Sequence, residues 1–162
     1  MTVIDEDRIG IYLNDHLAGA AAGLELARRT ARSNSRDRAA LTDIANEIAA
    51  DREELLAIMA RLGVPVSRYK QVATWTLEKL GRLKFNGRLF SRSPISDVLE
   101  VEALRLGVEG KAAGWLLLRR LAEQDDRLDP ARLDRLIERA ARQAEVLEGL
   151  RISAAEETFA AG

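Results

Sequence analysis

Cysteine is absent from this chain of 162 residues, and histidine and aromatic side chains are scarce. Without cysteine, disulfides, thiolate metal sites and cysteine nucleophiles are all excluded. Aromatic residues make up only 4% of the chain, while alanine, leucine, arginine and glutamate abound, and no convincing alternation of apolar and polar residues marks a strand. This composition favours helices over sheets.

Long hydrophobic runs are also missing. The longest, such as residues 112–118, fall far short of the roughly 20 apolar residues that span a bilayer. The first ten residues, MTVIDEDRIG, are acidic and lack the basic and apolar regions of a signal peptide. With 47% apolar and 31% charged residues, the composition is that of a globular protein. We therefore expect one soluble, cytoplasmic domain covering residues 1–162.

What the chain does contain is a helical repeat of apolar residues. The repeat predicts four long helices at about 5–32, 36–62, 94–124 and 130–159. Turn and capping residues separate them: the Ser33–Asn34–Ser35 stretch, Gly63 followed by Pro65, and the Ser93–Pro94 and Asp129–Pro130 pairs. The short links between the first two and the last two helices predict two antiparallel hairpins.

Two helices carry features that predict close packing. Residues 97–121 are apolar on more than one side, which is typical of a helix surrounded by others. Gly19 and Gly23 lie inside the first helix, where glycine destabilises relative to alanine. We therefore expect another backbone to approach the first helix closely at these glycines, and we expect the third long helix to be the centre of the bundle.

The segment between the two hairpins predicts the architecture. Residues 67–85 have one apolar face and read as a shorter helix, and Asn86–Gly87 then marks a turn. A four-helix bundle with a single long crossover is the ferritin-like arrangement, whereas an up-down-up-down bundle would not need this segment. The predicted fold class is thus all-α, a ferritin-like antiparallel four-helix bundle with a helical crossover between the second and third long helices.

Three runs of sequence resemble a known family. They are residues 12–19 (YLNDHLAG), 78–89 (EKLGRLKFNGRL) and 106–111 (LGVEGK), and they are similar to a family of uncharacterised bacterial proteins. The resemblance covers nearly the whole chain and implies a ferritin-like helical domain. It implies no activity.

The histidine count excludes the usual di-iron site of ferritin-like enzymes. That site needs two Glu-x-x-His motifs, but the chain has one histidine, His16, preceded at three residues by Leu13. A mononuclear zinc or manganese site built from Asp15, His16 and nearby acidic residues (Glu47, Asp51 or Glu109) remains an alternative, although an arginine beside it would repel the cation. The sequence predicts no catalytic residue, no metal ligand and no cofactor.

Polar residues nevertheless fall on the predicted inward faces, near the helix midpoints that meet in an antiparallel bundle. They predict a polar core layer of His16, Arg52, Glu102, Glu109 and Gln143. Because an unpaired buried charge is very unfavourable, we expect Arg52 and Glu109 to form an ion pair. The alternative is that these side chains lie at the surface, where arginine keeps its charged end in water.

The crossover segment is strongly basic. Residues 67–92 carry seven basic side chains and one acidic one, a local charge of +6 in a chain whose net charge is −1. The basic residues are Arg68, Lys70, Lys79, Arg82, Lys84, Arg88 and Arg92. Together with four aromatic residues they form a candidate surface for an anionic membrane, a nucleic acid or a partner helix. The alternative is an ordinary amphipathic crossover with a solvated charged face.

These observations favour a non-enzymatic structural or interaction module that self-associates, with residues 110–114 (GKAAG) as a face for a second copy. A metal-dependent enzyme with an atypical polar core is the first alternative. A peripheral binder of anionic membrane or nucleic acid is the second.

Overall fold

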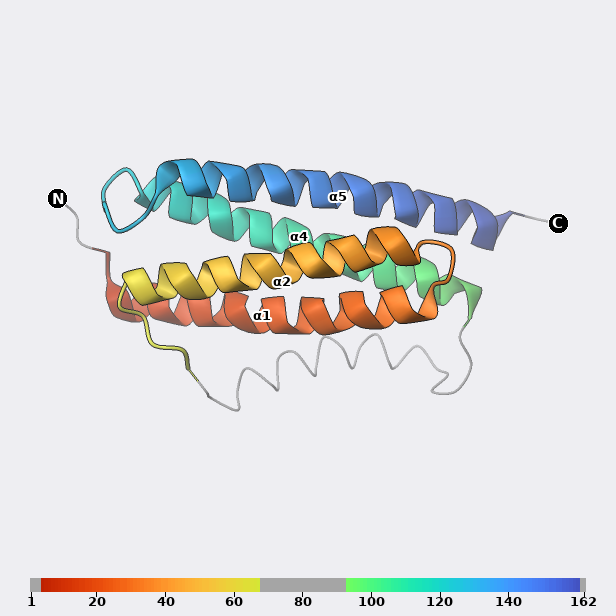
Figure 1. The fold of residues 1–162 in the computed structure, drawn as a ribbon, viewed down its shortest axis with the longest axis horizontal. Helices are drawn as coiled ribbons and strands as arrows, with labels where there is room; N and C mark the ends of the chain where they lie inside the picture. Colours follow the sequence, from red (N-terminus) through yellow and green to blue (C-terminus); the bar gives the residue numbers. More distant parts are fainter. Residues whose placement is uncertain (1–3, 68–92, 161–162) are drawn as a thin grey trace.

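The chain folds into four helices, described in a computed structural model for residues 4–67 and 93–160 (Figure 1). They are α1 (Glu6–Ser33), α2 (Arg38–Arg61), α4 (Pro94–Leu121) and α5 (Pro130–Phe159). No strand occurs within those two ranges. The predicted all-α four-helix bundle is confirmed, and the helix ends lie within three residues of those expected. The expected crossover helix at 67–85 lies outside the described residues, except for Ser67.

Side-chain caps explain where two of the helices begin. Asp5 Oδ1 accepts a hydrogen bond from the Arg8 N–H of α1 at 3.0 Å. Asp129 Oδ1 accepts one from the Arg132 N–H of α5 at 3.1 Å. Each bond satisfies an N–H that has no partner inside its helix. Pro130 occupies the first position of α5, where a missing N–H is harmless.

The end of α2 depends on a glycine in a left-handed conformation. Gly63 has φ +72°, and its N–H donates to the carbonyl of Ala60 at 3.2 Å. The Val64 N–H reaches back to the carbonyl of Met59 at 2.9 Å. This pair of bonds is the Schellman motif, and the buried side chains of Val64 and Met59 supply its apolar contact. Gly63 therefore ends the helix because other residues adopt this φ at a cost.

Contacts between the hairpins fix the helix directions. Arg29 near the end of α1 contacts Glu100 near the start of α4 at 3.8 Å. His16 in the first half of α1 lies against Gly114 in the second half of α4. These two contacts make α1 and α4 antiparallel. Since α1 and α2 form one hairpin and α4 and α5 the other, α2 and α4 run in the same direction (Figure 1). The C-terminal end of α2 and the N-terminal end of α4 therefore lie at opposite ends of the bundle.

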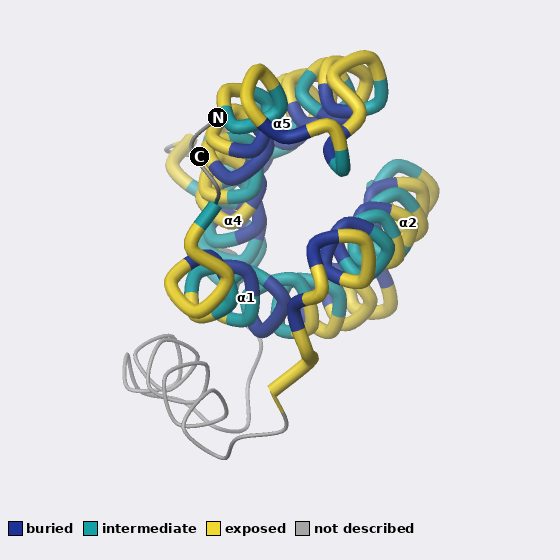
Figure 2. Tube along the Cα trace, turned by 90° about the vertical axis from the view of Figure 1, so that its left-hand side faces the viewer, coloured by how far each residue is buried: buried dark blue, intermediate teal, exposed yellow. Residues whose placement is uncertain are grey.

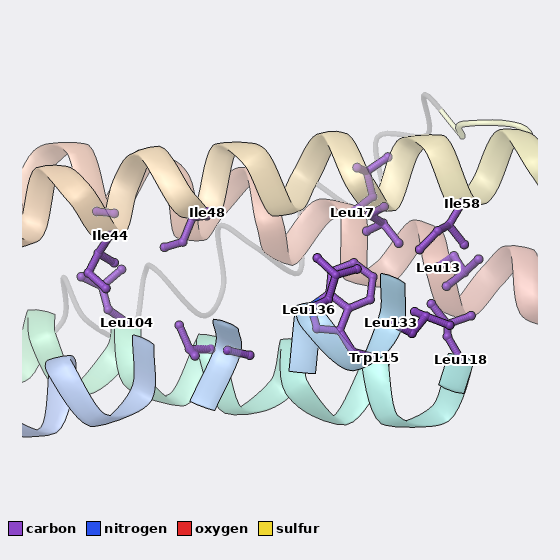
Figure 3. Packing of buried hydrophobic residues seen from close by; sticks show 14 of the residues in the cluster. Leu13, Leu17, Ile44, Ile48, Ile58, Leu104, Trp115, Leu118, Leu133 and Leu136 are labelled. Carbon is purple, nitrogen blue, oxygen red and sulfur yellow. The ribbon is translucent and has the colours of Figure 1, made fainter. Parts of the chain in front are cut away.

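The four helices are not equally close to one another. Viewed end-on, α1 lies beside both α2 and α4, α4 lies beside α5, and α2 stands apart from α5 (Figure 2). The buried sides of all four helices face a common interior. Apolar side chains fill it along its length, including Ile44 and Leu104 at one level and Leu13, Trp115 and Leu133 at another (Figure 3).

The fold corrects the expectation that α4 is the centre of the bundle. Its buried side carries Val101, Val108 and Trp115, but Leu106 is 63% exposed and Leu116 53% exposed. The helix packs against α1 and α5 only on one side, so its second apolar face is open. None of the described helices is long and apolar enough to cross a membrane.

The expectation about Gly19 and Gly23 is also wrong. Among residues 4–67 and 93–160, no atom outside the local helix backbone lies within 4 Å of a Cβ atom built at either position, so no other described backbone approaches them. The close contact is at Gly114, where a Cβ atom would lie 3.1 Å from Cε1 of the His16 ring. The tight glycine is therefore on α4, and a side chain of α1 occupies the space.

Replacing Gly63 or Gly23 by alanine tests the conformation and the free space assigned to each glycine. Gly63→Ala is expected to lower the free energy of unfolding by about 1 kcal/mol, because alanine is strained at a left-handed φ. Gly23→Ala is expected to raise it by about 0.5–1 kcal/mol, because the helix gains propensity and the added Cβ has room. Urea unfolding followed by circular dichroism measures both changes. Equal effects of the same sign would contradict the assigned conformations.

Candidate functional site

The most buried charge of the described chain is the carboxylate of Asp51 on α2, whose side chain is 2% exposed. Asp51 Oδ2 accepts a hydrogen bond from Lys111 Nζ of α4 at 2.5 Å. Asp51 Oδ1 accepts one from Arg139 Nε of α5 at 2.7 Å. Cations from two other helices thus hold one carboxylate in the interior.

Gln143 of α5 completes this group of side chains. It is 1% exposed, and its Oε1 accepts a hydrogen bond from Lys111 Nζ. Its Nε2 donates to Glu47 Oε2 at 2.8 Å and to Asp51 Oδ2 at 3.2 Å. Both ends of the amide are therefore used, as buried polar groups require. We call Glu47, Asp51, Lys111, Arg139 and Gln143 the ionic cluster.

Helical spacing brings these residues together. Glu47 and Asp51 are four residues apart and lie one turn above the other on α2. Arg139 and Gln143 have the same spacing on α5, which runs antiparallel to α2. Lys111 reaches the pair of helices from α4 with its long aliphatic stem, and its side chain is 15% exposed.

The cluster is electrically balanced. Two carboxylates, Glu47 and Asp51, face two cations, Lys111 and Arg139. Burial lowers the pKa of Lys111, and nearby Arg139 adds to this, while Asp51 and Glu47 oppose the shift. The Lys111 ammonium already donates to two acceptors, so the cluster binds its charges internally and presents no free nucleophile.

A second ion pair continues the polar contact between α2 and α5. Arg132 holds Glu54 through two parallel hydrogen bonds, Nε to Oε2 at 2.5 Å and Nη2 to Oε1 at 2.8 Å. Such bidentate pairs are directional and comparatively strong. Long charged side chains therefore bridge α2 and α5, the neighbouring helices that pack least closely in Figure 2.

The structure places one residue of the expected polar core layer, Gln143, in the ionic cluster. The expected Arg52–Glu109 pair is corrected: Arg52 Nη1 contacts Glu53 at 3.0 Å, and Glu109 contacts Arg105 at 3.2 Å. The Glu109 side chain is 53% exposed. Glu102, with its side chain 47% exposed, lies 3.4 Å from Arg151 of α5. Arg52, Glu102 and Glu109 therefore lie at the surface, as the alternative prediction from the sequence stated.

On α4 a rotation of about one residue explains the missed positions, whereas on α2 a single expected position is replaced by its neighbour. The buried side of α2 passes through Ile48, Asp51 and Leu55, whereas the expected face passed through Arg52. On α4 the buried side passes through Leu104, Val108 and Trp115. Sequence reasoning missed Lys111 and Arg139, and it named Glu47 and Asp51 only as alternative metal ligands. The available signal was the pairing of Glu47 with Asp51 and of Arg139 with Gln143 at four-residue spacing beside apolar stripes.

His16 lies apart from the cluster, in the contact between α1 and α4. Its ring is half-buried, packs 4.5 Å from the ring of Tyr12 at a tilt of 57°, and covers Gly114. Burial lowers the pKa of His16, and the neighbouring carboxylate of Asp15 partly offsets that shift. No three His, Asp or Glu side chains converge as a metal-binding group within residues 4–67 and 93–160.

The candidate basic surface of the crossover, from Arg68 to Arg92, lies outside the described residues. Comparisons of the chain with protein-family models, with curated proteins and with solved structures found no match. A function for the chain must therefore be inferred from the geometry of the described helices.

Removing the central carboxylate tests the ionic cluster. Asp51→Leu is expected to lower the free energy of unfolding by about 3 kcal/mol, the lower end of the range for breaking a buried pair, because Arg139 is partly exposed and can turn to water. Adding Lys111→Met is expected to recover at least about 1 kcal/mol relative to the sum of the two single changes. Denaturant unfolding of the three variants measures this coupling.

The neighbouring residue provides the control. Arg52→Leu changes an exposed pair with Glu53 and is expected to shift stability by less than about 0.5 kcal/mol. A larger loss for Arg52→Leu than for Asp51→Leu would reverse the assignment of the buried face.

The single imidazole gives a direct pH test. Because the pKa of His16 is lowered from 6.5 in the folded state, the unfolded state binds more protons between the two pKa values. Stability is therefore expected to fall as the pH drops from 6.5 through the folded pKa. NMR titration of the His16 ring is expected to show a midpoint below 6.5, and Asp15→Asn should lower it further. A midpoint at or above 6.5 would contradict the burial of the ring.

Proposed function

We propose that the protein is a non-enzymatic, ferritin-like helical module that binds other protein chains, and that it self-associates through α4. The observation that carries this proposal is the exposed leucine face of α4, on a bundle whose buried charges are already paired. The ferritin-like assignment is supported by two antiparallel hairpins in which α2 and α4 run in the same direction.

The exposed face of α4 has a regular arrangement of large and small residues. Leu106, Gly110, Ala113 and Leu117 are all exposed and lie within about 60° of one another around the helix. Leu106 is 63% exposed and Leu117 is 39% exposed. A Cβ atom at Gly110 would meet nothing within 4 Å, so space remains above the middle of this stripe.

The order of the stripe is symmetric, which favours a second copy of this chain as the partner. Leucine stands at both ends and small residues stand in the middle, with equal spacing on either side of the Lys111–Ala112 bond. A two-fold axis through that point would bring two antiparallel α4 helices together. Leu106 of one chain would then lie beside the partner's Leu117, and the small residues would let the backbones approach.

The ionic cluster supports a structural rather than catalytic interior. Its hydrogen-bonding groups are used by one another, and its two positive and two negative charges cancel. The residues of the rival metal site also have partners, since Glu102 contacts Arg151 and Glu109 contacts Arg105. Elemental analysis of protein purified without an affinity tag separates the two classes, because a stoichiometric transition metal would favour a metal enzyme.

Charge placed on the stripe tests self-association. Leu106→Glu and Leu117→Glu are each expected to convert a dimer to a monomer at micromolar concentration, because a carboxylate would be buried in the contact. Light scattering coupled to size-exclusion chromatography measures the mass. Ile11→Glu is the control, since Ile11 of α1 is 75% exposed and lies outside the stripe. A monomeric parent protein, or a dimer that survives both changes, would remove α4 as the interface.

A further inference from the structure

A hollow of about 360 Å³ lies between the C-terminal part of α1 and the N-terminal part of α2. Two small residues, Ala31 and Ala45, are among its lining residues, and the hollow is open to solvent. Its rim is made by the exposed side chains of Arg28, Arg32, Arg38, Thr42 and Asn46. Three arginines therefore line the hollow, and none of its described lining residues carries a carboxylate.

The arginines of the hollow differ from their neighbours in sequence. Arg29 contacts Glu100 at 3.8 Å, and Arg36 contacts Asp37 at 2.9 Å. Within the described part of the chain, Arg28 and Arg38 have no carboxylate within 4.0 Å, and Arg32 meets Glu25 only at 3.9 Å. The ion pairs of the bundle thus leave three positively charged arginine side chains around this hollow.

The adjoining hollow provides a contrast within the same groove. It has about 530 Å³ and is lined by Arg28 and Arg52 but also by Glu25 and Glu53. Its charges offset one another, whereas those of the three-arginine hollow do not. An anion in the groove would therefore be attracted to the end at Arg32 and Arg38.

The polar groups of the hollow match a phosphate group. Guanidinium groups donate paired hydrogen bonds to phosphate oxygens in a fixed planar geometry. The Asn46 amide adds a further possible donor on the rim. Thr42 has a different role, since its hydroxyl donates to the carbonyl of Arg38 at 2.7 Å and fixes that turn of α2.

We propose that this hollow binds the phosphomonoester group of a small phosphorylated ligand. The proposal is independent of self-association through α4, because the hollow lies on α1 and α2. The phosphomonoester belongs either to a free phosphorylated metabolite or to a phosphatidic acid headgroup. The hollow exceeds the size of one phosphate group, so part of the attached organic moiety enters it as well.

Binding to defined probes tests the site. Glycerol 3-phosphate and inorganic phosphate are titrated calorimetrically into the full chain at low ionic strength, and phosphatidylcholine vesicles with and without phosphatidic acid are tested by flotation. Saturable binding of glycerol 3-phosphate identifies a free ester as the source. Binding only to vesicles that contain phosphatidic acid identifies the headgroup. Binding to none of these probes would overturn the proposal.

Variants locate the binding. The double variant Arg28→Ala/Arg38→Ala is expected to bind at least about tenfold more weakly, since each charged hydrogen bond to phosphate is lost. Its unliganded melting temperature is expected to change little, because the hydrogen bond from Arg38 Nη2 to the Arg32 carbonyl at 3.3 Å is lost while repulsion between the arginines is relieved. The matched control is Arg135→Ala/Arg142→Ala, which removes the same charge from exposed positions of α5. Equal loss in both double variants, or full binding by the first, would overturn the proposal.

Discussion

The buried carboxylate of Asp51 is the constraint that organises the bundle. An unpaired charge in the interior is strongly unfavourable, so the fold is stable only when cations reach this position. They come from different helices, Lys111 from α4 and Arg139 from α5. Hydrogen bonds are more directional than apolar contacts, and a buried polar network is costly unless each of its members is satisfied. The ionic cluster therefore sets the register of three helices at once.

The same constraint explains why the two hairpins meet differently on their two sides. On one side α1 lies close to α4, where the imidazole of His16 rests directly on Gly114. On the other side α2 and α5 stand apart and are bridged by long side chains, including the bidentate pair of Arg132 with Glu54 (Figure 2). Arginine is suited to this position because its planar group spans the distance and meets a carboxylate with two bonds.

Much of the fold could be predicted because local signals mark the helix ends. Asp129 before Pro130 and Gly63 after α2 act through their own backbone geometry, and the structure shows those caps. The orientation of α4 could not be predicted in the same way. Its sequence is apolar on two sides, and a shift of one residue turns a helix by about 100°. The contacts of Lys111 with Asp51 of α2 and Gln143 of α5 belong to the inward-facing side of α4, and these partners are distant in sequence.

Gln143 could be placed from sequence because it interrupts a stripe that is otherwise apolar, between Ala140 and Leu147. Asp51 and Arg52 are both charged, and only the four-residue spacing of Asp51 from Glu47 beside the apolar stripe indicates which of the two is buried. The pairing of charges between helices also bears on the three arginines of the hollow, Arg28, Arg32 and Arg38. Ion pairs join helices throughout this bundle, whereas Arg28 and Arg38 have no carboxylate within 4.0 Å in the described part of the chain. Positive charges that lack an acidic partner attract anions, which is why the proposed phosphate site lies there and not at the paired arginines.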